Sequence, residues 1–227
     1  MQTHMGKQQG FTLIEIAIVL VIIGLLLGGV LKGQEMIENA KAKNAVTDFN
    51  GVVAAVNAYR DRYRQLPGDD GPTATLTARG TAWTGLTGNA NPNGVIATAA
   101  TNPFAAGANE TLWAWQHLRA SGLITGNATT AGVAALPKNA FGGQTGIGSG
   151  YFGLPGSVVV CMNNVPGKAA GAIDTQLDDG NPTTGSIISL GTNANLPTAV
   201  PTGANAPAVS TTAVYNEGFA YTVCRAS

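Results

Sequence analysis

The stretch that decides the fold is GFTLIEIAIVLVIIGLLLGGVL, residues 10–31, near the start of a 227-residue chain. A helix over 11–31 is roughly 30 Å long at 1.5 Å per residue, which is about the thickness of the hydrocarbon core of a bilayer. Residues 16–31 carry no charge, but Glu15 stands at the front of the run. A carboxylate inside such a span costs roughly 2.5–3.5 kcal/mol on insertion scales, so we expect Glu15 to have a function.

The motif Gly10-Phe-Thr-Leu-Ile-Glu15 follows a short polar segment that contains Lys7, and it leads directly into the apolar run. In this context it resembles the processing site of type IV pilins and of the pseudopilins of type II secretion. The resemblance implies a leader at residues 1–10, cut after Gly10 by a prepilin peptidase that also methylates the new amine of Phe11. It also implies that Glu15 pairs with the N-terminal ammonium of a neighbouring subunit and sets its axial register. Two charges buried in an apolar filament core are tolerable only where they meet.

Other interpretations of the segment explain less. A secretory signal peptide has an apolar core of 7–15 residues, which is shorter than this one. Its small-residue cleavage site could only be Ala40-Lys41-Ala42, well past the apolar block. A plain membrane anchor explains the length but not a carboxylate beside a Gly-Phe junction. For Glu15 itself the alternative role is an interfacial carboxylate that reaches lipid headgroups.

The sequence predicts one helix from about residue 11 to 65, with two different halves. The first half, residues 11–33, is apolar all round. The second half, residues 34–65, is amphipathic and should pack against a folded domain. Its apolar positions recur in steps of three and four: Val46, Phe49, Val52, Val53, Val56, Tyr59 and Tyr63. The pattern stops at residues 66–70, Leu-Pro-Gly-Asp-Asp, where Asp69 and Asp70 are interpreted as turn residues.

Four glycines interrupt the apolar half: Gly24, Gly28, Gly29 and Gly33. Small residues of this kind allow close helix packing in membranes. Many pilins carry a proline near the end of this stretch and lose helicity there in the filament. This chain has Lys32 instead, so whether its helix melts on assembly stays open.

The predicted fold class is α+β and type IV pilin-like. The apolar half of the helix protrudes, and the amphipathic half packs against a small antiparallel sheet within a globular domain over 34–227. Residues 66–150 are loop-rich, with a surface loop over 71–108 and a short helix over 110–121. That helix is capped by Asn109, ended by Gly122 and anchored in the core by its tryptophans. Strands are predicted in the region 151–227 at 157–162, 186–190 and 219–224, with a loop over 191–211.

The chain has two cysteines, Cys161 and Cys224. A domain outside the cytoplasm would be expected to join them as a disulfide. The resemblance agrees, because pilins commonly staple their C-terminal segment to the sheet in this way. The alternative is two free buried thiols.

Oxygen ligands gather at Asp174, Asp178, Asp179 and Asn181, near a Gly-Asn-Pro turn. Calcium prefers several such oxygens, and major pseudopilins have a C-terminal loop that can hold this ion. The spacing is not that of an EF-hand loop. The alternative interpretation is a solvated turn with no metal, and no other cofactor is expected.

Composition limits the function classes. Charged residues make up 11% of the chain and the formal net charge is zero, which argues against nucleic-acid binding. No pairing of a nucleophile with a base and no nucleotide-binding glycine loop is visible, so an enzyme is not expected. We therefore predict a structural subunit of a type IV pilus or related filament. A pseudopilin is the alternative within the class, and an anchored or secreted enzyme or binding protein is the alternative outside it.

The predicted partners are other copies of the chain, the prepilin peptidase and methyltransferase, and an inner-membrane assembly platform. The precursor would sit in the inner membrane with its N-terminus in the cytoplasm. The filament would lie at the cell surface or in the periplasm.

Overall fold

The computed structural model describes residues 12–89, 92–96, 103–151, 158–192 and 214–227. The chain divides into two compact units, of which the first ends at Ala40 and the second begins at Lys41. The predicted leader, together with Gly10 and Phe11, lies outside the described residues.

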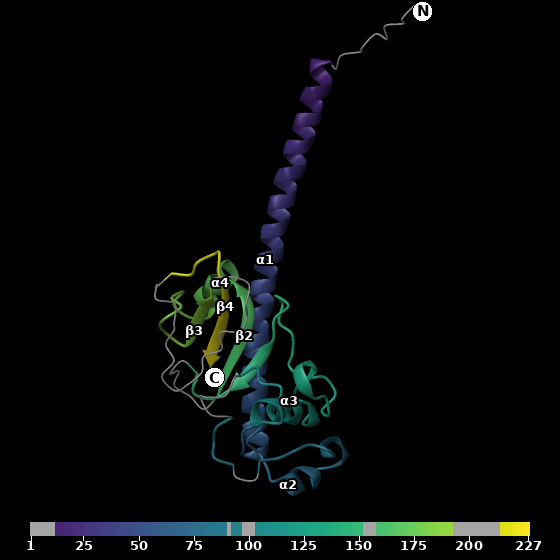
Figure 1. Ribbon diagram of the computed structural model, residues 1–227, viewed down its shortest axis with the longest axis vertical. Coiled ribbons are helices and arrows are strands. Elements are labelled where there is room, and N and C mark those ends of the chain that lie inside the picture. Colours follow the sequence, from purple (N-terminus) through teal and green to yellow (C-terminus); the bar gives the residue numbers. More distant parts are fainter. Residues whose placement is uncertain (1–11, 90–91, 97–102, 152–157, 193–213) are drawn as a thin grey trace, which may run out of the picture. The chain divides into compact units, whose positions relative to one another are not determined.

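The long helix predicted from the sequence is confirmed as α1, Leu13–Tyr63 (Figure 1). It runs without a break through all four glycines of its apolar half. It ends where Arg64 adopts a positive φ of 60°, just before the predicted turn at Leu66 and Pro67. Pro67 cannot continue a helix, and the residue before a proline is itself disfavoured in helical geometry.

The amphipathic half of α1 contributes one face to the core of the second unit. Phe49, Val56 and Tyr59 of the predicted stripe are buried. The other members of the stripe are partly buried against the same core: Val46, Val52, Val53 and Tyr63. Three alanines that the apolar pattern did not single out are buried as well, namely Ala42, Ala45 and Ala55. Their small side chains allow the helix backbone to approach the core closely.

The sheet is antiparallel and has four strands in the order β1-β2-β4-β3. Three of them confirm the predicted strands: β2 Val159–Pro166, β3 Ile187–Thr192 and β4 Ala220–Ala226. The edge strand β1, Thr145–Gly148, was not predicted. It pairs with β2 through residues such as Ile147, which stands opposite Val160. Figure 1 shows β2 and β4 beside the second half of α1, and Arg225 of β4 donates a hydrogen bond to Asn50 of α1.

The short helix is confirmed as α3, Glu110–Ala120. Asn109 caps it by accepting a hydrogen bond from the N–H of Leu112, at 3.1 Å. Gly122 follows the helix with φ of +75°, the left-handed geometry of a residue just past a helix end. Trp115 is fully buried, as a core anchor should be, whereas Trp113 is half-buried. A second helix, α4 Gly167–Leu177, follows β2 directly and was not predicted.

The prediction of a plain surface loop over 71–108 is wrong for much of its described part. That part contains α2, Thr73–Thr77, and the 3-10 helix η1, Thr81–Trp83. A further 3-10 helix, η2, lies outside this range and spans Gly132–Ala135. Within 71–108, several side chains belong to the core: Leu76, Trp83, Leu86, Ile96 and Phe104. These apolar residues stand singly among Gly, Ala and Thr and follow no period, so their burial had no signal in the sequence. Most of the predicted loop over 191–211 lies outside the described residues.

Candidate functional site

The apolar half of α1 exposes large hydrophobic side chains on every face. Leu13 is 93% exposed and Leu25 is 74% exposed, and none of residues 13–32 is buried. Among the described residues, α1 is the helix long and apolar enough to cross a membrane, by length and composition. Water is a poor environment for such a surface, since burial stabilises it by roughly 25 cal/mol per Å² of apolar area. Another apolar phase must therefore cover it.

Glu15 lies in the first turn of α1 and is held by its own helix. Its Oε2 accepts hydrogen bonds from the N–H and the hydroxyl of Thr12, at 2.8 and 2.7 Å. In return the N–H of Glu15 donates to Thr12 Oγ1, at 3.4 Å. This reciprocal pair is a capping box, in which a Thr at the N-cap and a Glu three residues later satisfy the free N–H groups of a helix start. The Thr-Leu-Ile-Glu spacing was a visible signal of this local role, although the sequence reasoning did not use it.

Among the described residues, none packs against the four glycines of the apolar half. A side chain built at Gly24, Gly28, Gly29 or Gly33 would meet nothing within 4 Å. Lys32 pairs with Glu35 on the surface of the same helix, at 2.9 Å. A glycine in a helix interior costs roughly 0.8–1 kcal/mol relative to alanine, and no contact among the described residues offsets this cost. The glycines permit melting of the helix on assembly without requiring it.

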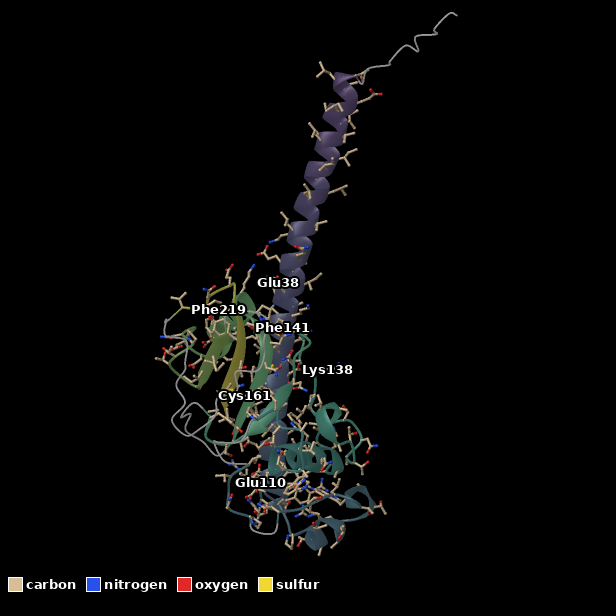
Figure 2. All side chains as sticks on the ribbon, viewed as in Figure 1. Glu38, Glu110, Lys138, Phe141, Cys161 and Phe219 are labelled. Carbon is tan, nitrogen blue, oxygen red and sulfur yellow. A yellow bond between two sulfur atoms is a disulfide. The ribbon has the colours of Figure 1, made fainter. Side chains whose placement is uncertain are left out.

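The predicted disulfide joins Cys161 of β2 to Cys224 of β4. The two residues stand directly opposite each other in the antiparallel register, and both are fully buried. Figure 2 shows Cys161 within the sheet. The bridge therefore fastens two neighbouring strands that are 63 residues apart in the chain.

The predicted acidic cluster is assembled at the end of α4. Asp174, Asp178 and Asp179 bring carboxylate oxygens within 4.8 Å of one another. Asp174 is fully buried, and burial raises its pKa to about 6. Hydrogen bonds from the hydroxyl of Tyr215 and the N–H of Gly180 counter part of that rise.

Protein donors already occupy oxygens in this cluster. Asp178 Oδ2 accepts from the N–H groups of Ser186 and Ile187, at 2.5 and 2.8 Å. Asp179 accepts from the hydroxyl of Thr184 at 2.6 Å and from the N–H of Asn181 at 2.8 Å. These bonds hold the turn between α4 and β3. Calcium takes six to eight oxygens, so three carboxylates supply only part of a shell. Calcium binding stays a prediction.

A buried polar network that the sequence reasoning missed lies beyond the end of α1. Asp70 is 1% exposed and forms a two-pronged ion pair with Arg79, with N–O distances of 2.6 and 3.1 Å. Tyr59 of α1 donates its hydroxyl to the same carboxylate, at 2.6 Å. The guanidinium of Arg79 lies over the rings of Tyr63 and Trp83, 4.3 and 5.0 Å from their centres.

Interpreting Asp69 and Asp70 as simple turn residues was therefore incomplete. Both residues lie in the turn but are buried, and both carboxylates accept hydrogen bonds from residues outside the turn. Asp69 Oδ1 accepts from the side-chain amide of Asn89 and the N–H of Asn93, and its Oδ2 accepts from the N–H of Gly94. An Asp-Asp pair after Pro-Gly carries no sequence signal that separates this role from a solvated turn.

His117 of α3 completes the network. Its Nδ1 accepts a hydrogen bond from the N–H of Gly68 at 3.0 Å, and its Nε2 donates to the carbonyl of Thr87 at 2.9 Å. Burial lowers the pKa of the ring, although the bond to Thr87 opposes this shift. Gly68 has φ of +88°, and a side chain there would meet the backbone of α3. The neutral ring, with its proton on Nε2, thus joins the turn after α1 to the following segment.

Comparison with known proteins gives one match. Residues 5–31 match the family model described as the prokaryotic N-terminal methylation motif. No curated protein and no solved structure matches the chain. The match covers the polar segment, the Gly-Phe junction, Glu15 and the apolar run, and it supports a prepilin-type signal in these residues.

Proposed function

We propose that the protein is a structural subunit of a type IV pilus or a related filament. Its precursor is cut after Gly10, methylated on Phe11 and polymerised through the apolar half of α1. The observation that carries the proposal is the methylation motif at residues 5–31, joined to a helix whose apolar side chains are exposed on all sides. Lipid covers this surface in the precursor, and neighbouring helices cover it in the filament.

Mass spectrometry of the N-terminus of the mature chain tests this proposal. Cleavage after Gly10 removes 10 of 227 residues and leaves 217, beginning with methylated Phe11. A chain that begins near Lys43 would instead indicate an ordinary secretory signal, and would favour an anchored or secreted enzyme or binding protein.

Glu15 is proposed to pair with the N-terminal ammonium of a neighbouring copy. The capping box with Thr12 supports this role in an indirect way, because it fixes the carboxylate at the very start of α1. Glu15 follows Phe11, the proposed new N-terminus, by four residues in the sequence. A meeting of its carboxylate with the ammonium of a neighbouring copy would offset the cost of burying both charges in an apolar core.

The matched test compares Glu15→Ala with Thr12→Val. Both variants break the capping box, but only the first removes the charge. Glu15→Ala should leave membrane insertion intact and abolish incorporation into filaments, whereas Thr12→Val should still be incorporated. Equal loss of filaments in both variants would assign Glu15 to helix capping alone.

The proposed partners follow from this assembly. They are further copies of the chain, the prepilin peptidase and methyltransferase, and an inner-membrane assembly platform. Contacts between subunits would be head-to-tail, which builds an open helical filament when the rotation does not close a ring. The predicted loop over 191–211 favours a pilin with a decorated surface. The segment that begins at Gly71 does not support this, because its Leu76, Trp83 and Leu86 lie in the core.

A pseudopilin is the second candidate, and the carboxylates gathered at Asp174, Asp178 and Asp179 favour it. Calcium held in a C-terminal loop would raise the melting temperature of the protein, since a ligand that binds only the folded state stabilises it. Thermal melting with added Ca²⁺ and with a chelator measures the effect. A rise that Asp178→Asn removes supports a calcium site; equal melting temperatures identify a metal-free turn.

Imaging of filaments from cells that produce only this subunit separates the two kinds of filament.

A further inference from the structure

The exposed apolar surface of α1 continues past Leu31, where the uncharged run ends. Met36 is 64% exposed and Ile37 is 58% exposed, although both side chains are large and apolar. Neither belongs to the hydrophobic core of the described residues, which begins along α1 at Ala42. The fold of the domain therefore does not account for these two side chains.

The charges of this part of α1 gather on the other side of the helix. Three charged residues follow one another in steps of three: Lys32, Glu35 and Glu38. Figure 2 labels Glu38 on the helix. Successive residues of a helix are about 100° apart, so Ile37 and Ala40 fall on the side opposite these charges and Met36 falls beside them. We call Met36, Ile37 and Ala40 the Met36–Ala40 face.

This face continues the apolar surface of the first half of α1 without a break. Counting back from Ile37 in alternating steps of four and three gives a series of uncharged positions: Gly33, Val30, Leu26 and Ile23. Such spacing keeps the residues on one side of a helix, and two helices that pack along each other use the same repeat. Val30 and Leu26 are exposed large hydrophobic residues of the proposed assembly surface. The Met36–Ala40 face is therefore an extension of that surface.

Lipid tails do not reach this face in a membrane-anchored precursor. The run over 11–31 already fills the roughly 30 Å of a hydrocarbon core. Ile37 lies six residues past Leu31, which places it roughly 9 Å farther along an upright helix. The headgroup layer is roughly 5–8 Å thick on each side, so Ile37 lies at or beyond its outer edge. The face thus has no role in anchoring, and burying its apolar area would be favourable.

A second copy of α1 is the cover that the proposed assembly supplies, and this step rests on the proposed function. If Glu15 of one copy meets the amine of Phe11 of the next, the two helices are offset by four residues, or roughly 6 Å. Because α1 extends to Tyr63, the neighbouring helix then runs well past the height of Ile37.

We propose that the Met36–Ala40 face is a contact surface for α1 of a second copy, and that this contact is made only in the filament. Lipid anchors the precursor without using the face, and assembly buries it. These residues therefore separate membrane insertion from polymerisation.

Oxidation of Met36 by dilute hydrogen peroxide measures whether the face is covered. Cleavage after Gly10 leaves two methionines, Met36 and the fully buried Met162. Peroxide transfers one oxygen atom to the thioether sulfur and leaves water, and mass spectrometry of the peptides follows the sulfoxide. Met36 should be oxidised readily in the unassembled chain in its membrane. In filaments the reaction should be at least about tenfold slower, because the contact must open before peroxide reaches the sulfur.

Glu38→Met is the matched control, since it places a methionine on the charged side of the same turn. That methionine should be oxidised at similar rates in both states, and Met162 should stay reduced. Equal rates for Met36 in membrane and filament overturn the proposal. Slow oxidation of Met36 in both states assigns the cover to lipid and overturns it as well. Equal protection of residues 36 and 38 in the filament would mean that peroxide is generally excluded, with the same consequence.

A second measurement uses Ile37→Gln, which keeps a good helix former but makes the face polar. This variant should be inserted, cleaved and methylated like the parent chain, yet lose most of its filaments. Asn39→Gln, at an exposed position outside the face, should assemble normally. An unchanged filament yield for Ile37→Gln overturns the inference. The mass spectra also separate the two proposals: a chain that begins near Lys43 lacks the face and ends both, whereas methylated Phe11 with an unprotected Met36 ends this one alone.

Discussion

Replacing Asp70 by asparagine should destabilise the second unit through a single, well-defined cause. The carboxylate of Asp70 holds the guanidinium of Arg79 in a two-pronged ion pair whose side chains are 1% and 19% exposed. Asparagine keeps the shape of the side chain and can still accept the hydroxyl of Tyr59. The change therefore removes the charge and leaves Arg79 in its place without a counter-charge.

The magnitude follows from that burial. Removing one partner of a buried ion pair typically costs 3–5 kcal/mol, because the other charge stays buried and unpaired. Arg79 keeps some contact with water, so we expect the lower end, about 3 kcal/mol. For a chain of this size each kcal/mol lowers the melting temperature by roughly 2–4 °C, which gives a decrease of about 6–12 °C.

Thermal melting of the full chain in micelles, followed by tryptophan fluorescence, measures this decrease. Asp61→Asn is the matched control, since Asp61 is an exposed carboxylate of α1 and its loss should change stability by less than about 0.5 kcal/mol. Adding Arg79→Met to Asp70→Asn should recover part of the loss, because no unpaired charge then remains. A decrease for Asp70→Asn no larger than that of Asp61→Asn would refute the reasoning.

Three further changes probe other parts of the domain. His117 is buried and neutral, and its pKa is lower in the folded state than in the unfolded state. As the pH falls, the unfolded state therefore binds a proton at a higher pH than the folded state does. The free energy of unfolding should fall below about pH 6.5, by at most about 1.4 kcal/mol per pH unit. Urea unfolding from pH 7 to 5 measures this slope, and a slope that persists in His117→Asn would assign it elsewhere. Replacing Cys161 and Cys224 by serine should cost about 4 kcal/mol, from the loop that the disulfide closes, and unchanged melting under non-reducing conditions would contradict this. Asn109→Ala should cost about 0.5–2 kcal/mol by removing the cap of α3, while Asn109→Ser, which can cap, should cost less; equal losses would argue against capping.

The parts of the fold that the sequence predicted are those with a strong period or a specific terminal signal. The second half of α1 shows apolar side chains at steps of three and four, and Asn109 and Gly122 frame α3. Strand β1, Thr-Gly-Ile-Gly, has two glycines in four residues and so lacks the composition of a strand. Helix α4 was hidden for a similar reason, because its sequence GKAAGAIDTQL holds two glycines and mostly small apolar side chains. Both elements form because neighbouring strands and the core support them.

The sequence predicted those parts of the candidate site whose residues lie close together along the chain. Thr12 and Glu15 are three residues apart, and Asp174, Asp178 and Asp179 fall within six. The buried network of Asp70, Arg79 and His117 was not predictable, because its members come together only through the fold.

The order of the strands has a consequence for when the domain can complete its fold during synthesis. Strand β4 is the last of the four along the chain, yet it lies between β2 and β3. Until residues 220–226 have been synthesised, β3 has no strand partner among the described residues, and Cys161 has no Cys224 with which to form the disulfide. Completion of the sheet therefore requires that synthesis has passed residue 226. A chain that ends before residue 220 would keep an unpaired edge on β3 and a free thiol at Cys161, and both would distinguish it from the full-length chain.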